Sequence, residues 1–335
     1  MKEIIITPNE SGQRLDKLLK KYLKEATGSF IYKMLRKKNI VLNDKKASGN
    51  EKLKEGDSVK LYFSDETLKK FEGQPVSQPK LKKTSGKKLS ILYEDDHILL
   101  INKPAGVLSQ KAEKNDVSMI EYLTDYLMET GQITEETLKT FRPAVCNRLD
   151  RNTSGLIVAG KSLPGLQKMA EIFKNRSVKK YYLCIVKGKL MRPAHIDGYL
   201  TKDARSNKVA VADRGEQRIE TEYEPIAWNE EVTLLKVHLI TGKTHQIRAH
   251  LSSIGHPLLG DYKYGNRTIN ETYKKQYHLN AQLLHAYQII FPKLQEPLQY
   301  LSDKSYIAPV PDKFWKIIKE TKWQHGIQEA LEVQH

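Results

Sequence analysis

The sequence has few of the features that mark disulfide-rich, metal-binding or membrane proteins. Only two of its 335 residues are cysteine, Cys146 and Cys184, which is too few for a disulfide framework or a zinc cluster and is typical of reduced, buried thiols. No apolar run approaches the ~20 residues of a membrane span, and no charged-then-apolar leader opens the chain. We therefore expect a cytoplasmic protein that makes no contact with a membrane.

Signatures of cofactor chemistry are missing as well. The sequence contains neither a glycine-rich nucleotide-binding loop nor a convincing metal-ligand spacing. His245 and His250 are five residues apart on a predicted helix, whereas a metal-binding pair on one helix face is normally four apart. We expect neither a cofactor nor a bound metal.

Charge is present in excess and is unevenly distributed. Residues 1–90 contain 22 Lys and Arg against 11 Asp and Glu, a net +11, whereas residues 91–335 contain 34 against 29, a net +5. Charge that served solubility alone would be spread more evenly. A basic first quarter joined to a nearly balanced body indicates a polyanion-binding module attached to another domain. Nucleic acid is favoured over a membrane surface, because no amphipathic helix carries an aromatic insertion face.

Residues 1–64 are predicted to form a compact α+β unit. Helical spacing of apolar residues marks one face of a first helix at Leu15, Leu18, Leu19, Tyr22 and Leu23. A second helix, "SFIYKMLRKKNI", follows and is apolar on one side and basic on the other. Two short strands with turns come next, in "IVLNDKKA" and "LKEGDSVKLYF".

This order of elements resembles the alpha-L RNA-binding domain, which occurs in a ribosomal small-subunit protein and in several RNA-modifying enzymes. The resemblance implies that the basic face of the second helix docks on structured RNA, through Lys33, Arg36, Lys37 and Lys38. The tripeptide Arg14-Leu15-Asp16 opens the first helix of this unit, and we expect a purely structural role for it.

Composition divides the rest of the chain into three parts. Residues 65–88 lose apolar periodicity and gain Lys, Pro, Ser and Gly, which predicts a flexible basic linker. Over residues 89–310, helices are scattered among hairpin-linked strands, which indicates a domain with a mixed, largely antiparallel sheet and flanking helices. Residues 311–335 are expected to form a C-terminal helix and a frayed tail. The predicted fold class is α+β, with the small α+β RNA-binding domain in front.

The tripeptide of the first helix recurs in mid-chain, in "NRLDRNTSGL" at residues 147–156. Here it is followed by turn-forming residues and then by "LIVAG", a predicted buried strand. Asp150 therefore lies in a polar loop at the start of a core strand, and the flanking Arg148 and Arg151 would keep its carboxylate ionised. This setting is equally typical of a catalytic carboxylate and of a turn residue paired with an arginine.

Three further stretches follow in order: "KYY" at 180–182, "GKTHQIRAH" at 242–250 and "GDYKYG" at 260–265. Together with "NRLDRNTSGL" they resemble the ordered motifs of the pseudouridine synthases that modify large-subunit ribosomal RNA. "YEDDHILLINKPAG" (93–106) and "LLHAYQIIFP" (283–292) resemble the ends of the same domain, so the resemblance spans roughly residues 89–310. The family usually has His where this chain has Asn147, a position beside the tripeptide that we expect activity to tolerate.

The resemblance implies an isomerase that needs no cofactor. Such an enzyme breaks the N-glycosidic bond of uridine, turns the bound uracil and rejoins it through carbon. Asp150 matches the essential aspartate, which acts as nucleophile or as base at the sugar. Arg248 matches the arginine that pairs with this carboxylate, and Tyr182 matches the tyrosine that stacks on the base and takes part in a late proton transfer. Tyr181 should face the other side of its strand; a register shift of one residue would exchange the two tyrosine roles.

Two other residues are candidates for substrate binding. Arg148 resembles the residue that fills the gap when the target nucleotide leaves its stack, a flip that costs a few kcal/mol. Ile247 is a candidate for the base pocket, with an ordinary core role as the simpler interpretation. Gly260, Asp261 and Gly265 are expected to shape a turn rather than to touch substrate.

The sequence thus predicts a stand-alone, monomeric RNA pseudouridine synthase acting on specific uridines in structured RNA, with large-subunit (23S) rRNA as the expected substrate. The alternative is a non-catalytic RNA-binding or ribosome-assembly factor on the same scaffold, and the joint presence of Asp150, Tyr182 and Arg248 argues against it. A hydrolytic uridine N-glycosylase would need a water-activating group, which we cannot place in the sequence.

Overall fold

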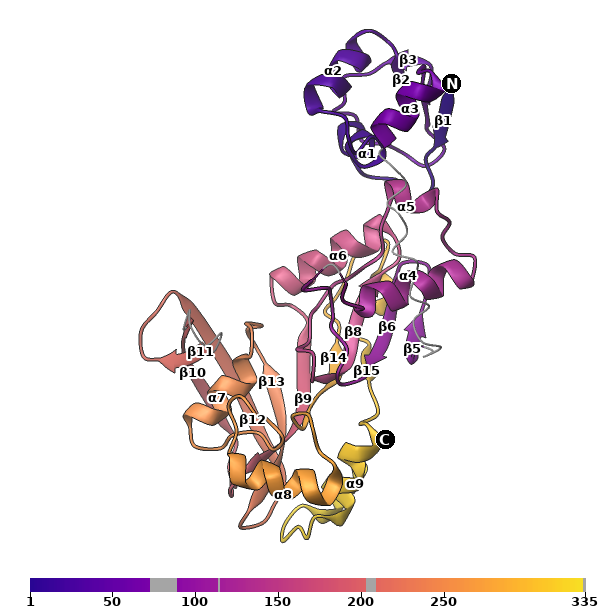
Figure 1. Cartoon of the computed structure of the whole chain (residues 1–335). Helices are drawn as coiled ribbons and strands as arrows, with labels where there is room; N and C mark the ends of the chain where they lie inside the picture. The colour runs from indigo at the N-terminus through magenta and orange to yellow at the C-terminus, as the bar shows by residue number, and fades with distance from the viewer. Residues whose placement is uncertain (73–88, 114, 203–208, 334–335) are drawn as a thin grey trace.

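The computed structural model of the chain describes residues 1–72, 89–113, 115–202 and 209–333. These residues form a small N-terminal module, at the top of Figure 1, and a larger body built on one long sheet. Within the described residues, every helix is too short or too polar to cross a membrane.

The N-terminal module is a four-stranded antiparallel sheet, in the order β1-β4-β2-β3, packed against helices. Its elements are β1 (Lys2–Ile5), α1 (Leu15–Tyr22), α2 (Gly28–Arg36), β2 (Ile40–Leu42), β3 (Lys45–Lys46), β4 (Ser58–Leu61) and α3 (Asp65–Glu72). The apolar face predicted for the first helix is buried in a core that belongs to this module alone, with Leu15, Leu18, Leu19, Tyr22 and Leu23 each at most 1% exposed.

The first Arg-Leu-Asp tripeptide is structural, as expected. The guanidinium of Arg14 pairs with the Asp16 carboxylate at 3.0 Å, and the Tyr32 hydroxyl donates a hydrogen bond to the same carboxylate. Leu15 lies between them in sequence and is fully buried.

The prediction of a flexible linker from residue 65 is wrong at its start. Asp65–Glu72 is helix α3, and Leu68 is buried in the core of the N-terminal module. Phe71 lies three residues further along the same helix and packs against Phe30, with 4.3 Å between the two ring centroids. Leu68 and Phe71 are three residues apart and form a short apolar stripe, which the basic composition of the whole segment concealed. Residues 73–88 lie outside the described residues.

The body confirms the predicted mixed, largely antiparallel sheet. Its strand order is β11-β10-β12-β13-β9-β14-β8-β6-β5, with β15 beside β14 and β7 beside β8, and only the β14–β8 pair is parallel. The elements are β5 (Ile91–Glu94), β6 (Ile98–Lys103), α4 (Met119–Glu129), α5 (Thr137–Thr140), β7 (Ala144–Val145), β8 (Ser154–Gly160), α6 (Leu163–Lys174), β9 (Lys179–Lys187), β10 (Ala194–Lys202), β11 (Val209–Ala212), β12 (Gln217–Trp228), β13 (Val232–Leu239), α7 (Gln246–Ser253), α8 (Arg267–Tyr277), β14 (Leu284–Ile290), the 3₁₀ turn η1 (Gln299–Leu301), β15 (Ser305–Ile307), α9 (Asp312–Glu320) and α10 (Ile327–Glu332).

Strand β9 separates two apolar cores because successive side chains point to opposite faces of the sheet. Tyr182 and Cys184 join the larger core, which also contains residues of α4, α6 and α7. Leu183 and Ile185 join a second core with α9 and α10 on the other face. The side chains of β9 therefore connect both layers, and its position near the middle of the sheet is visible in Figure 1.

The C-terminal segment contains two helices instead of the single helix and frayed tail that we expected. Gly326 adopts the left-handed conformation, with φ of 72°, and α10 begins directly after it. Ala330 is fully buried in the second core, and Val333 is 6% exposed. Residues 334–335 lie outside the described residues.

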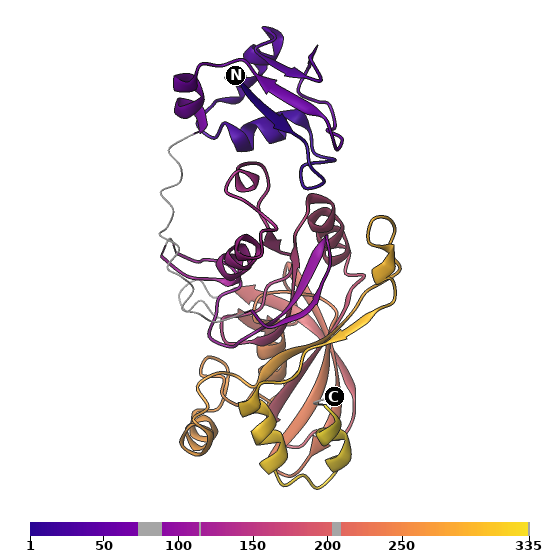
Figure 2. The ribbon, with the colours of Figure 1, turned by 90° about the vertical axis from the view of Figure 1, so that its right-hand side faces the viewer.

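The N-terminal module contacts the body at α5, beneath it in Figures 1 and 2. The Thr140 hydroxyl donates a buried hydrogen bond of 2.6 Å to Glu10. Lys2 forms an ion pair with Glu136 at 3.0 Å. The contact is small and polar, in contrast to the separate apolar cores on either side of it.

We predict that Gly155→Ala strongly lowers stability. Gly155 opens β8 with φ of 108°, and a Cβ there would lie 2.2 Å from the Ala286 carbonyl oxygen of β14. Separating the two strands should cost about 3 kcal/mol or more of unfolding free energy, measured by denaturant titration. Gly131→Ala is the control, because φ is also positive there (71°) but no atom lies within 4 Å, so it should lose only about 1 kcal/mol. Equal losses would contradict the role of close strand contact.

Candidate active site

Asp150 lies in the loop between β7 and β8, and the Asn147 side chain holds this loop against the strand that follows. The Asn147 amide donates to the Leu156 carbonyl at 3.2 Å and accepts from the Val158 N–H at 2.8 Å. These two bonds use both ends of the amide. Asn147 therefore closes the loop through hydrogen bonds to β8. This is the position at which the resembled family usually has His.

A fully buried lysine supports the same loop. The Lys103 ammonium donates to the carbonyl oxygens of Pro104, Val107 and Arg151 at 2.9, 2.8 and 3.0 Å, so each N–H has one acceptor. Burial lowers the pKa of Lys103 to about 7, and the nearby Asp150 charge opposes this shift. Lys103 thus joins the end of β6 to the residue that follows Asp150.

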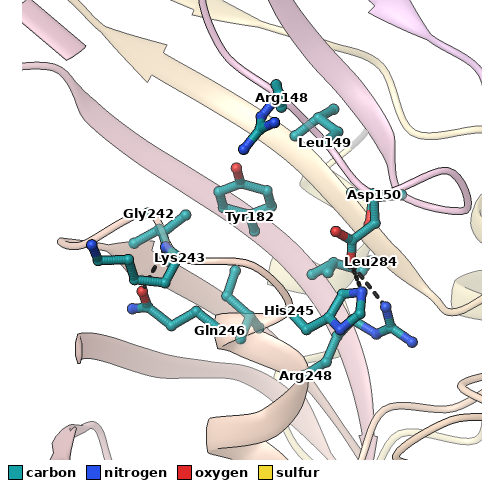
Figure 3. Close-up of a pocket in the computed structure, with 13 residues that line it drawn as sticks. Arg148, Leu149, Asp150, Tyr182, Gly242, Lys243, His245, Gln246, Arg248 and Leu284 are labelled. Atoms are coloured by element: carbon teal, nitrogen blue, oxygen red, sulfur yellow. Dashed lines mark hydrogen bonds and ion pairs between the residues drawn. The ribbon is translucent and has the colours of Figure 1, made fainter. Parts of the chain in front are cut away.

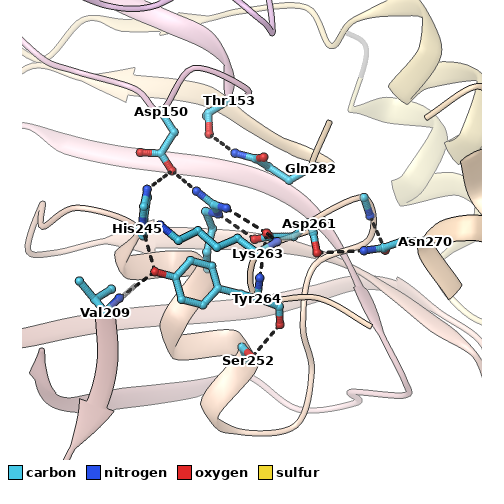
Figure 4. Close-up of polar contacts among 12 residues, drawn as sticks. Asp150, Thr153, Val209, His245, Ser252, Asp261, Lys263, Tyr264, Asn270 and Gln282 are labelled. Atoms are coloured by element: carbon cyan, nitrogen blue, oxygen red, sulfur yellow. Dashed lines mark hydrogen bonds and ion pairs between the residues drawn. The ribbon is translucent and has the colours of Figure 1, made fainter. Parts of the chain in front are cut away.

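The structure brings Asp150 together with Arg248 of α7, as the resemblance implied. Arg248 Nη1 donates to Asp150 Oδ2 at 2.8 Å. On its other side, Arg248 donates through Nε and Nη2 to the two carboxylate oxygens of Asp261, at 2.7 and 2.9 Å. One guanidinium therefore joins two carboxylates, as Figure 4 shows.

Burial makes this arrangement strongly ionic. The Asp261 side chain is 0% exposed and that of Arg248 is 9% exposed. Burial alone would lower the pKa of Arg248, but the hydrogen bonds and charges of Asp261 and Asp150 outweigh it and raise the pKa. Burial would likewise raise the pKa of Asp261, and its bonds to Arg248 and to backbone N–H groups lower it instead. Arg248 and Asp261 are therefore both charged at neutral pH.

The turn that carries Asp261 also places the Tyr264 ring beside the guanidinium. Asp261 accepts the N–H groups of Lys263 and Tyr264 at 2.9 and 3.1 Å, which bends the chain so that the Tyr264 ring lies 5.0 Å from the guanidinium carbon of Arg248. The Tyr264 hydroxyl lies 3.0 Å from Nδ1 of His245. The turn predicted for this segment is present, and its aspartate has the additional role of fixing Arg248.

His245 is another ionisable group beside the Asp150 carboxylate. Its Nε2 lies 3.9 Å from Asp150 Oδ2, and its backbone is left-handed with φ of 55°, just before α7. Burial lowers the pKa of His245, while the Asp150 charge acts in the opposite direction. Within the described residues, no group of three or more His, Cys, Asp or Glu side chains could hold a metal ion.

An open cavity of ≈ 90 Å³ lies in front of Asp150. One wall carries Asp150 and Arg248, and the opposite rim carries Gly242 and Lys243 (Figure 3). The apolar part of the lining consists of Leu149, Tyr182, Leu239, Ile247 and Leu284. The cavity thus has a charged end beside an apolar slot.

The two neighbouring tyrosines face opposite sides of β9, in the register that we predicted. Tyr182 lines the cavity and is 7% exposed. Burial and the Asp150 charge both raise its pKa. Tyr181 lies on the other face, with its ring stacked 4.9 Å from that of His238.

The other predicted site residues occupy two separate places. Arg148 lines the cavity and is exposed. Ile247 also lines the cavity but is only 4% exposed, so it belongs to the apolar core and to the cavity wall at once. The four cations predicted to contact RNA are exposed in and just after α2, in the N-terminal module and away from the cavity: Lys33, Arg36, Lys37 and Lys38.

Sequence reasoning missed three residues of this site. Asp261 was placed in a turn, His245 was weighed only as a metal ligand, and Lys103 was not singled out. A lysine directly after the apolar run "ILLIN" was an available signal, because a lysine at such a position is seldom buried without a specific partner. A single sequence gives no signal for the Asp261–Arg248 contact. The distance between the two residues along the chain does not tell which arginine lies next to the turn that carries Asp261.

Comparison with known proteins agrees with the geometry. The profile of a family described as RNA pseudouridylate synthase matches residues 97–253. Ribosomal large subunit pseudouridine synthase C of Vibrio vulnificus is 30% identical over 325 residues, covering 95% of both chains. Ribosomal large subunit pseudouridine synthase D of Neisseria meningitidis is 29% identical over 96% of this chain and 82% of its own.

Solved structures support the fold. Human RNA pseudouridylate synthase domain containing 4 superimposes with a TM-score of 0.52 at 22% identity, over 73% of this chain and 92% of that one. Human RNA pseudouridylate synthase domain containing 1 gives a TM-score of 0.50 at 20% identity, over 70% and 96%. At these identities the likeness concerns the fold alone.

We predict that Asp261→Asn destabilises the protein by about 3 kcal/mol, because it leaves a buried guanidinium with half of its compensating charge. Urea unfolding would measure the loss. Asp197→Asn is the matched control, since Asp197 pairs with Arg218 at 3.6 Å on the surface with more than half of each side chain exposed. That exposed pair should contribute less than about 1 kcal/mol. If both variants lost the same amount, Asp261 would not be the support of Arg248.

Proposed function

The chain belongs to the RNA pseudouridylate synthase family and is an isomerase that converts uridine in RNA to pseudouridine; we propose that it acts on large-subunit ribosomal RNA and that Asp150 carries the reaction. The reaction needs one ionised carboxylate near the ribose and a pocket that retains the freed base. A carboxylate beside an apolar lining, as found in the cavity described above, supports this proposal. The products and reactants are isomers, so the chemistry consumes no oxidant, water or donor group.

One observation carries the assignment to Asp150. Its Oδ2 is held by Arg248 at 2.8 Å, whereas its Oδ1 has no hydrogen-bond partner among the described residues. Figure 3 shows the carboxylate at the cavity wall with one oxygen turned away from Arg248. A carboxylate anchored at one oxygen and free at the other is oriented for reaction, either as a nucleophile at the sugar or as a base that removes a proton from it.

Arg248 acts as the positioning partner of this carboxylate. A charge-assisted hydrogen bond of this length fixes the orientation of the Asp150 carboxylate. Because Asp261 holds the other edge of the guanidinium, Arg248 cannot follow substrate into the cavity. The carboxylate is therefore oriented before RNA binds, which lowers the entropic part of the barrier.

Tyr182 and the apolar slot retain the base. Tyr182, Leu239 and Leu284 all line the cavity, so a uracil that enters it can stack on the Tyr182 ring. After cleavage of the glycosidic bond the base must turn without escaping, and an apolar slot permits rotation because it forms no directional bonds. The raised pKa of Tyr182 keeps its hydroxyl protonated, so that it can donate a proton late in the reaction.

Arg148 is proposed to enter the RNA helix when the target nucleotide leaves it. The residue is exposed at the cavity mouth, and the Tyr182 hydroxyl points toward it in Figure 3. Extrusion of a base costs a few kcal/mol, and a guanidinium that stacks in the vacated position offsets part of this cost. Ile247 is proposed to contact the base from α7.

The choice of substrate rests on the relatives. The similar proteins from Vibrio vulnificus and Neisseria meningitidis carry names that refer to the large ribosomal subunit. We also propose, as the sequence suggested, that the protein acts as a monomer. Ribosomal RNA of the large subunit would place the reaction in the cytoplasm.

The N-terminal module is proposed to bind the same RNA as an alpha-L domain. In Figure 1, α2 lies well apart from β9 and α7, which contribute to the cavity, so the exposed cations in and just after α2 would contact phosphates distant from the target uridine. We assign residues 1–72 to this domain, because α3 packs on its core, and residues 89–310 to the catalytic domain, with the C-terminal helices packed on its sheet.

We predict that Asp150→Asn binds RNA with nearly wild-type affinity but releases no tritium from RNA that contains 5-tritiated uridine. The substitution keeps shape and removes the charge that the reaction needs. Binding would be measured by filter retention at constant salt, as the control for folding. Turnover above about a hundredth of the wild-type rate, an effect of under ~3 kcal/mol on the barrier, would remove Asp150 from its role and favour the non-catalytic alternative.

We predict that replacing Lys33, Arg36, Lys37 and Lys38 by Gln in the full-length chain weakens RNA binding and reduces its salt dependence. Each lost phosphate contact should lower the slope of log affinity against log salt by about 0.7 to 0.9, with turnover at saturating RNA unchanged. The control replaces the exposed Lys316 and Lys319 of α9, at the opposite end of the molecule in Figure 1. An unchanged slope in the first variant would show that α2 is not the RNA contact.

A further inference from the structure

Lys180 is a partly buried lysine at the edge of the cavity. It lies two residues before Tyr182 in β9, so both side chains point to the same face of the sheet. Its ammonium Nζ is 3.7 Å from the position that a Cβ would take on Gly242, and Gly242 lines the cavity rim opposite Asp150. The ammonium group therefore lies beside the cavity mouth, next to a residue that has no side chain to cover it.

This ammonium has no counter-charge. Within the described residues, Lys180 forms neither a hydrogen bond nor an ion pair, and the charged group that acts on it is Arg176, which repels it. Burial, with a further contribution from Arg176, lowers the pKa of Lys180. A cation withdrawn from water beside another cation is destabilising unless an anion arrives.

Other buried lysines in the chain differ in this respect. Lys161 is paired with Glu94 at 2.6 Å and donates to the Asp95 carbonyl at 2.7 Å. Lys103 has three carbonyl acceptors. Lys180 thus differs from these two lysines in having no acceptor for its ammonium group. A polar group that is withdrawn from water without a partner is often explained by a ligand or by a function.

We propose that Lys180 and Arg176 form an anion site at the cavity rim that binds a backbone phosphate of the RNA, next to the nucleotide held in the cavity. This inference rests on the proposed function, since it concerns the same substrate. Arg176 is exposed in the connection between α6 and β9, and it is close enough for its charge to act on Lys180. Two cations on one phosphodiester position the strand without reading its sequence.

The site complements the one on the N-terminal module. The cations of α2 lie far from the cavity, whereas Lys180 lies on the same strand as Tyr182. A phosphate held at the rim would fix the ribose of the extruded nucleotide relative to Asp150, across the cavity. We therefore expect this contact to strengthen productive binding rather than to alter the chemical step.

The test compares Lys180→Met with Lys179→Met in the full-length protein. Methionine keeps the unbranched stem and removes the charge. Lys179 is exposed on the opposite face of the same strand, which makes it the matched control. The substrate is an RNA fragment in which the wild-type protein forms pseudouridine, and kcat and KM are measured over a range of salt concentrations.

For Lys180→Met we expect kcat/KM to fall about tenfold, mainly through KM, and the salt slope to fall by about 0.7 to 0.9. Its thermal midpoint should equal or exceed that of the wild type, because an unpaired cation is removed. A midpoint well below that of Lys179→Met, or kinetics and a salt slope equal to those of Lys179→Met, would overturn the proposal.

A second measurement locates the phosphate. RNA with a single neutral methylphosphonate is prepared at each position around the target uridine. At one position the neutral group should impair the wild type about tenfold and leave Lys180→Met unaffected, since the contact is already lost. Equal impairment of both proteins at every position would refute the phosphate contact. Wild-type protein that forms no pseudouridine in any ribosomal RNA would instead refute the proposed function, and with it this inference.

Discussion

A single guanidinium shared between two carboxylates is the interaction on which the site depends. Arg248 is held by Asp261 through two bonds of 2.7 and 2.9 Å and in turn holds Asp150 at 2.8 Å. Asp261 and Arg248 are both buried. Breaking their ion pair would leave an uncompensated charge in the interior, which would lower the free energy of unfolding by a large amount. The buried pair therefore holds the Asp150 carboxylate in place at the cavity wall.

The sheet makes this arrangement possible by bringing distant segments to one place. Asp150 precedes β8, Tyr182 lies in β9 and Arg248 lies in α7, and the central strands β8, β14 and β9 are adjacent in the sheet. Strands β8 and β14 run so close together at Gly155 that a side chain there would collide with the backbone of β14. This explains why glycine stands at this position, just after the loop. Asn147 and Lys103 then hold the loop by bonds to backbone groups, so its shape does not depend on substrate.

Sequence predictions succeeded where a local pattern or an ordered set of motifs was available. The apolar stripe of α1, the alternation of Tyr181 and Tyr182 and the largely antiparallel sheet are all present in the structure. Predictions failed where a short amphipathic helix lies within a longer segment whose overall composition is typical of a linker or a tail. Helix α3 was concealed by a basic, proline-containing stretch, and α10 by a polar C-terminal segment in which Ala330 and Val333 are the buried residues.

By itself, the sequence determined which chemistry was possible: a lone carboxylate in a turn, a tyrosine two residues after a lysine in a strand, and an arginine in a helix, in an order that identifies a family. Both copies of Arg-Leu-Asp are equally visible in the sequence, yet only the second lies at a cavity, because only its loop faces α7. The tertiary structure alone decided that Asp261 supports Arg248 and that Lys180 has no ion-pair or hydrogen-bond partner among the described residues. Long-range ion pairing depends on which surfaces the folded sheet brings together, and residue spacing along the chain carries no record of it.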